Sequence, residues 1–152
     1  MTRIPMTLAG GGAAGAPAPT CPTDDCTACG GVMYVDVNFA TCGCGTFTGT
    51  FSPTAANEGA EPLTECVWYG SNGNQYVDDG AACSLRFDDI FCAFGYWEFN
   101  LAVDDGDTIG EAEYKRVSTG NGDCPEGTYT KDSSSCTEGS DTFPTNLTVY
   151  SS

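Results

Sequence analysis

Ten cysteines and no histidine are the feature of this 152-residue chain that most limits what it can fold into. Without histidine there is no Ser-His-Asp or Cys-His catalysis and no histidine-ligated metal. Leu, Ile, Val and Phe together supply only 24 residues, few for an aliphatic core in a chain of this length. We therefore expect the cysteines to stabilise the fold, as disulfides or as thiolate ligands of a metal ion.

The spacing of the cysteines leaves both alternatives open. Cys26-x-x-Cys29 and Cys42-x-Cys44 are short pairs, each followed by glycine, that could place four sulfurs around a tetrahedral zinc ion. The number of cysteines and the lack of histidine ligands favour disulfides for the same four residues. The remaining disulfide candidates are Cys21, Cys66, Cys83, Cys92, Cys124 and Cys136. Their connectivity does not follow from spacing.

The chain is strongly acidic, with 21 Asp and Glu against 5 Lys and Arg and a formal net charge of −16. Binding to phosphates needs clustered basic side chains, so we expect no nucleic-acid partner. No run approaches the roughly 18 apolar residues of a membrane span, and no apolar signal region is visible, so we expect no membrane association. Oxidation of the cysteines then requires a signal that has been removed, or release from a lysed cell, as happens to a virion.

The composition of residues 1–20 differs from that of the rest of the chain. This stretch is rich in Gly, Ala and Pro and contains almost nothing that could build a core. We expect a flexible or extended arm at 1–20, followed by one cysteine-rich β domain at 21–152. An arm without its own core becomes ordered only against another chain, so we expect it to bind a partner in a homo-oligomer or multi-copy assembly.

Alternation of apolar and polar residues predicts an all-β fold. Strands are expected at residues 32–39, 46–51, 66–70, 75–77, 84–90, 91–103, 111–117 and 145–150. The Asn72-Gly73 step favours a hairpin between the third and fourth of these, and residues 118–141 resemble a long polar loop. Short strands at loop-separated intervals indicate an antiparallel β-sandwich or a jelly-roll-like barrel.

Asp104, Asp105 and Asp107 are candidate calcium ligands, because hard cations prefer several carboxylate oxygens on a tight turn. The distal glutamate of an EF-hand is missing, so a solvated β-turn is the alternative. The other paired carboxylates, such as Asp88-Asp89, are interpreted as solubilising charges. We expect no enzymatic activity and no cofactor beyond zinc or calcium at the positions named.

Aromatic side chains offer one further site. Tyr69, Tyr76 and Tyr96 could form a platform for carbohydrate, whereas packing between strands is the alternative explanation for them.

Several segments carry a resemblance to a loose class of small cysteine-rich β proteins encoded by bacteriophages and environmental bacteria. They are Cys26-Thr27-Ala28-Cys29, Val32–Val37, Cys42-Gly43-Cys44, Phe47–Phe51, Cys66–Tyr69 and Tyr96–Leu101. The resemblance spans roughly residues 26–103 and implies a structural role in a virion. It does not extend to the acidic region from Ser118 onward.

The leading expectation is therefore a non-enzymatic phage virion protein, exposed as a head decoration or a tail-associated subunit. It would bind capsid or tail subunits through its N-terminal arm and lie on the virion surface. The alternative is an extracellular protein, a secreted or surface-attached binding module for glycan or calcium.

Overall fold

The structure, a computed structural model, is built from antiparallel strands, and no helix occurs in the part of the chain that it describes. The described residues are 17–24, 26, 28–55, 66–70, 75–77 and 82–152. The strands are β1 (Tyr34–Ala40), β2 (Thr46–Phe51), β3 (Thr54–Ala55), β4 (Trp68–Tyr69), β5 (Gln75–Val77), β6 (Ser84–Phe87), β7 (Phe91–Ala93), β8 (Tyr96–Asp104), β9 (Thr108–Val117), β10 (Gly127–Cys136) and β11 (Asn146–Tyr150). The all-β, antiparallel prediction is confirmed.

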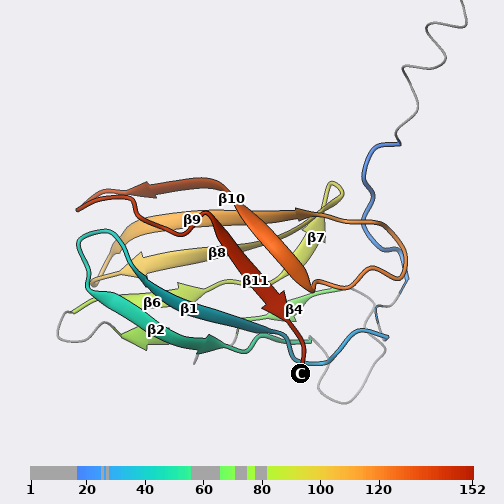
Figure 1. The fold of residues 1–152 in the computed structure, drawn as a ribbon, viewed down its shortest axis with the longest axis horizontal. Helices are drawn as coiled ribbons and strands as arrows, with labels where there is room; N and C mark the ends of the chain where they lie inside the picture. Colours follow the sequence, from blue (N-terminus) through green and yellow to red (C-terminus); the bar gives the residue numbers. More distant parts are fainter. Residues whose placement is uncertain (1–16, 25, 27, 56–65, 71–74, 78–81) are drawn as a thin grey trace, which may run out of the picture.

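One large sheet curls until its two ends meet. Its strand order is β2-β1-β11-β10-β9-β8-β6-β5, with β7 also paired to β8, while β3 and β4 form a separate two-stranded sheet. At the seam, the Tyr76 hydroxyl of β5 donates to the Thr50 carbonyl of β2, and the Tyr76 ring lies edge-on to Phe51 at 4.6 Å between centroids. Side chains rather than a strand ladder therefore complete a nearly closed, barrel-like sheet (Figure 1).

Aromatic side chains fill the interior in place of the missing aliphatic residues. The inward positions follow the predicted alternation, with Val35 and Val37 buried on β1 and Trp97, Phe99 and Leu101 on β8. Phe99 lies at the centre, and its centroid is 4.9 to 5.2 Å from the rings of three residues on β6, β9 and β10. These residues are Phe87, Tyr114 and Tyr129. Burial of large rings supplies much of the apolar area that aliphatic side chains usually provide.

Five disulfides pair all ten cysteines, which confirms the disulfide alternative for the fold. The pairs are Cys21–Cys92, Cys26–Cys66, Cys29–Cys124, Cys42–Cys136 and Cys44–Cys83. They join residues 39 to 95 positions apart. Each one therefore holds together segments that are remote in the chain.

The single strand predicted at 91–103 was wrong, because a two-residue turn divides it. Ala93 pairs with Tyr96 across Phe94-Gly95, and φ is positive at both turn residues, 52° and 84°. Two positive φ values define a type I′ hairpin turn, which ordinarily carries Asn-Gly. The first turn position holds phenylalanine instead of asparagine, so the sequence did not indicate a turn there.

Replacing Phe94 by asparagine is expected to raise the free energy of unfolding. The Phe94 side chain is 97% exposed, so little packing is lost, while asparagine tolerates the left-handed conformation better, by about 1 kcal/mol. Urea denaturation of F94N beside F94A measures this, because alanine removes the ring without easing the backbone. Equal destabilisation of both variants would contradict the expectation.

Two further predictions about strands were wrong. The segment predicted at 66–70 does not form a hairpin with 75–77, because β4 pairs with β3 and β5 pairs with β6; the turn itself lies outside the described residues. The predicted polar loop 118–141 contains the ten-residue strand β10. Only Tyr129 of β10 is fully buried, so β10 lacks the alternation by which strands were predicted. Its pairing with β9 and β11 makes it a strand.

Candidate functional site: the end of the barrel that holds the N-terminal segment

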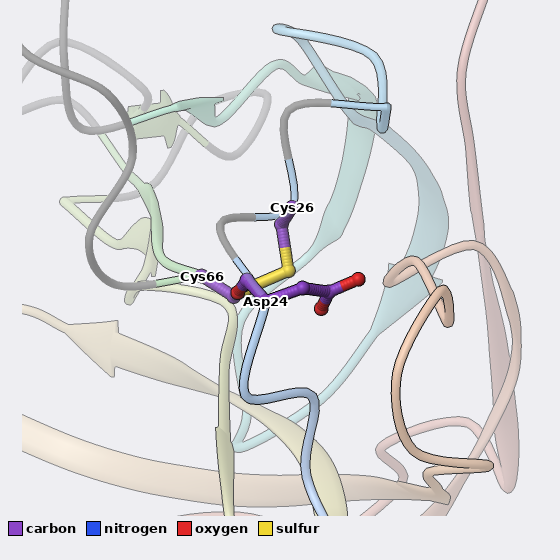
Figure 2. Close-up of side chains that lie close together, drawn as sticks. All are labelled: Asp24, Cys26 and Cys66. Atoms are coloured by element: carbon purple, nitrogen blue, oxygen red, sulfur yellow. A yellow bond between two sulfur atoms is a disulfide. The ribbon is translucent and has the colours of Figure 1, made fainter.

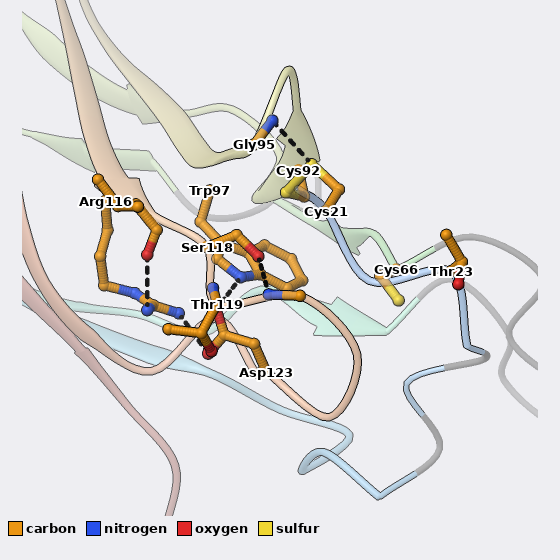
Figure 3. The surroundings of a disulfide bond; sticks show 12 residues. Cys21, Thr23, Cys66, Cys92, Gly95, Trp97, Arg116, Ser118, Thr119 and Asp123 are labelled. Atoms are coloured by element: carbon orange, nitrogen blue, oxygen red, sulfur yellow. Dashed lines mark hydrogen bonds and ion pairs between the residues drawn. A yellow bond between two sulfur atoms is a disulfide. The ribbon is translucent and has the colours of Figure 1, made fainter. Parts of the chain in front are cut away.

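The described N-terminal segment, residues 17–24, lies across the end of the barrel near the β7–β8 turn (Figure 1). The Cys21–Cys92 disulfide fixes this segment to β7, and the Gly95 amide donates to Cys21 Sγ at 3.3 Å (Figure 3). A Cβ added at Gly95 would overlap the Pro19 carbonyl, so glycine is required for this close approach. The segment is therefore anchored covalently at one point and packed closely beside it. Residues 1–16 of the predicted arm lie outside the described residues.

The loop between β9 and β10 also contacts this segment, at Thr23 and Asp24. The Thr23 amide donates to Asn121 Oδ1 at 2.6 Å, and the Gly122 amide donates to Asp24 Oδ2 at 3.0 Å. The loop and the N-terminal segment are thus clamped together by backbone amides and side-chain oxygens.

Asp123 fixes the conformation of that loop. Its carboxylate accepts hydrogen bonds from Trp97 Nε1 at 3.0 Å and from the Thr119 amide at 2.9 Å, and it pairs with Arg116 Nη2 at 3.2 Å (Figure 3). Burial by itself raises the pKa of Asp123, but these donors lower the pKa more, so it lies below its ordinary value. The charged carboxylate therefore ties the loop to β8 and β9.

A groove of about 560 Å³ opens beside the N-terminal segment. The Cys21–Cys92 and Cys26–Cys66 disulfides lie at its walls. The other residues that line it come from the N-terminal segment, from β4 and the residue before it, and from the residues around β7: Pro22, Thr23, Asp24, Val67, Tyr69, Asp89 and Phe91. Tyr69 is 44% exposed. The groove thus combines two carboxylates with two aromatic rings.

Asp89 is the more enclosed of the two carboxylates. Its Oδ1 accepts the Gly70 amide at 3.0 Å. Burial raises the pKa of Asp89 and the neighbouring Asp88 adds to the rise, while the Gly70 amide opposes it, so the pKa lies above its ordinary value. A nearby positive charge would favour the ionised form of this carboxylate.

Asp24 also approaches the Cys26–Cys66 disulfide. A carboxylate oxygen and the two sulfurs lie within 4.8 Å of one another (Figure 2). Metal ions are bound by thiolates, and these two sulfurs are bonded to each other. In the oxidised protein the cluster therefore offers one carboxylate rather than three ligands.

Of the two alternatives for the four closely spaced cysteines, the structure contains the disulfides, and the alternative four-cysteine zinc site is corrected. Cys26, Cys29, Cys42 and Cys44 are each bonded to a different distant cysteine. Their sulfurs are used in four separate disulfides, because the sheet order brings each one beside another segment instead of beside the others.

The candidate calcium ligands lie at the end of β8 and in the turn that follows it. Asp104 Oδ1 accepts the Thr108 hydroxyl at 2.8 Å and its Oδ2 pairs with Arg86 at 3.4 Å. Asp105 and Asp107 hydrogen-bond each other across the turn. Local partners thus engage all three residues, and calcium binding here stays a prediction.

The three tyrosines considered as a carbohydrate platform lie in different surroundings. Tyr76 packs at the barrel seam, Tyr69 lines the groove, and Tyr96 pairs with Val117 between β8 and β9. Sequence reasoning did not identify Asp24 and Asp123 as functional residues, because each lies in a polar stretch without periodicity and meets its partners only in the folded chain.

Comparison of the chain with protein-family models, with curated proteins and with solved structures gave no match. Among the described residues, no helix is long and apolar enough to cross a membrane.

Proposed function

We propose that this chain is a non-enzymatic structural protein exposed on a bacteriophage virion, as a head decoration or a tail-associated subunit. The observation that carries the proposal is the anchored N-terminal segment. Cys21 lies in the segment that directly follows the arm, and its disulfide to Cys92 ties that segment to β7. A load on the preceding arm would pass to the sheet through a covalent bond, which suits an arm that tethers the domain to capsid or tail subunits.

The charge and the disulfides support an outward position. A net charge of −16 repels packaged DNA at contact range, since the Debye length is about 8 Å at physiological salt. Five disulfides require an oxidising medium, which a virion meets after lysis. We also propose that the curled sheet packs face to face, as in a β-sandwich or jelly roll. The contact between Phe51 on β2 and Phe87 on β6, at 5.3 Å between ring centroids, supports this.

Deleting residues 1–16 tests the tether. Residues 17–24 and the Cys21–Cys92 disulfide stay in place, so we expect a folded domain with an unchanged melting temperature that no longer attaches to particles. Particles purified on a density gradient, with the copy number measured by quantitative mass spectrometry, give the result. A full-length C21S/C92S variant serves as the comparison, because it keeps the arm but removes its covalent anchor, and we expect reduced occupancy.

Normal occupancy after the deletion would contradict the tether. Detection of the domain against packaged genome, for example by crosslinking to DNA, would contradict the outward position.

The groove favours a second candidate, an extracellular binding module for glycan or calcium. A pocket of about 560 Å³ with aromatic and carboxylate walls is within the size range of ligand sites. The coding neighbourhood separates the two candidates, because capsid or tail genes beside this one favour the virion protein, whereas an upstream start that encodes a signal peptide favours the secreted module.

A further inference from the structure

The groove beside the Cys21–Cys92 and Cys26–Cys66 disulfides contains two carboxylates, Asp24 and Asp89, that have no ion pair with any basic side chain among the described residues. In the part of the chain that the structure describes, all four basic side chains are engaged elsewhere. Arg86 pairs with Asp88 and Asp104, and Lys115 pairs with Glu113 and Asp132.

The other two basic side chains also have their partners outside the groove. Arg116 pairs with Asp123, and Lys131 donates to the Phe143 carbonyl at 3.0 Å. Neither Asp24 nor Asp89 has an ion pair with any of these four residues. Their known donors are the backbone amides of Gly122 and Gly70. Backbone amides are neutral, so both carboxylates keep their negative charge uncompensated.

Aromatic walls distinguish this groove from a second acidic hollow among the described residues. Tyr69 and Phe91 line the groove beside the two carboxylates, whereas the hollow over β8, β9 and β10 is lined by Glu111, Glu113 and serines without an aromatic ring. A cation that enters between a ring face and a carboxylate gains both a cation–π contact and a charge-assisted hydrogen bond.

We propose that this groove binds an arginine or lysine side chain of a partner protein, held between Tyr69 and the carboxylates of Asp24 and Asp89. The occupant is a basic segment because the walls are anionic and aromatic. None of the described basic residues neutralises the two carboxylates, and the net negative charge of the protein repels anionic ligands. The inference rests on the proposed function only for the source of that segment, a neighbouring virion subunit. The groove lies beside the anchored N-terminal segment, so the same end of the barrel would contact the partner twice.

Peptide titration of the full-length oxidised protein tests the proposal. Tetra-arginine, tetra-lysine and tetra-glutamate peptides are added while two-dimensional amide NMR spectra are recorded. We expect the two basic peptides to shift the amides of residues 21–24, 66–70 and 89–92, and the acidic peptide to shift none of them. The expected loss of affinity in D24N/D89N is about tenfold, because two hydrogen bonds to charged groups are weakened.

The matched control is D105N/D107N, which removes the same charge from the exposed β8–β9 turn and should retain most of the affinity. Y69A should weaken binding of tetra-arginine, whereas Y150A, which removes an exposed tyrosine on β11, should not. The melting temperature of each variant shows that it is folded.

Three results would overturn the proposal: no shifts with either basic peptide, shifts spread over the whole acidic surface, or equal losses in the two double variants. Calcium chloride that produces the same local shifts and displaces tetra-arginine would also overturn it in favour of a metal site. Particle attachment is measured separately with the deletion of residues 1–16, so failure of this groove and failure of the proposed function are distinguishable.

Discussion

Reduction of the five disulfides is expected to unfold the domain in the absence of denaturant. Each disulfide closes a stretch of 39 to 95 residues, which corresponds to about 4 kcal/mol of chain entropy in the unfolded state. Their sum is an upper bound of about 20 kcal/mol because the loops interleave, but it exceeds the roughly 5–15 kcal/mol that stabilises a typical domain. A core with so few aliphatic residues leaves little to replace that contribution.

Near-ultraviolet circular dichroism and tryptophan fluorescence measure this outcome, because Trp68 and Trp97 are fully buried in the oxidised protein. After reduction and alkylation we expect loss of the near-ultraviolet signal and a red shift of the emission. The control is oxidised protein treated with the alkylating reagent alone, which finds no free thiol among the ten cysteines. A reduced, alkylated protein that still melts cooperatively would contradict the prediction.

Replacing Asp123 by alanine is expected to lower the free energy of unfolding by about 3 kcal/mol. Asp123 and Arg116 are only 12% and 18% exposed at their side chains, so the substitution leaves a largely buried guanidinium without its carboxylate. Arg116 Nε already lacks a hydrogen-bond partner, and the Trp97 indole would lose its acceptor as well. D123N keeps an acceptor oxygen and should fall between the wild type and D123A.

Asp132 provides the matched control. Its carboxylate also forms an ion pair, with Lys115 at 3.1 Å, but its side chain is 53% exposed. Because exposed pairs contribute about 0–1 kcal/mol, D132A should cost far less than D123A. Equal effects of the two substitutions in urea denaturation would show that burial of the Asp123 pair is unimportant.

The stability difference between the wild type and D123N should also depend on pH. The native pKa of Asp123 lies below its ordinary value, so its contribution is complete above the unfolded pKa of about 3.9 and disappears as pH falls through the native pKa. We therefore expect a constant difference from neutral pH down to about pH 5 and a shrinking one below about pH 4. A difference that grows on acidification would contradict the assigned sign.

Local patterns predicted the strands whose two faces differ in environment. β1, β2, β8 and β11 occur close to where alternation indicated them. A strand with one buried and one exposed face alternates apolar and polar residues, and this pattern can be seen in its own sequence. The division of 91–103 was missed because Phe94 stands where a turn residue is expected. β10 was missed because most of its residues are exposed and its partners β9 and β11 determine its conformation.

The sequence by itself determined that this protein is all-β and that cysteine chemistry stabilises it, since alternation and composition are properties of neighbouring residues and of total counts. Only the tertiary structure decided which cysteines pair, and it placed the four sulfurs of the alternative zinc site in four separate disulfides. It also brought Asp123 beside Trp97, and it placed Asp24 and Asp89 in the same groove. These sites join residues tens of positions apart, and their distances depend on the order of strands in the sheet, which local sequence does not encode.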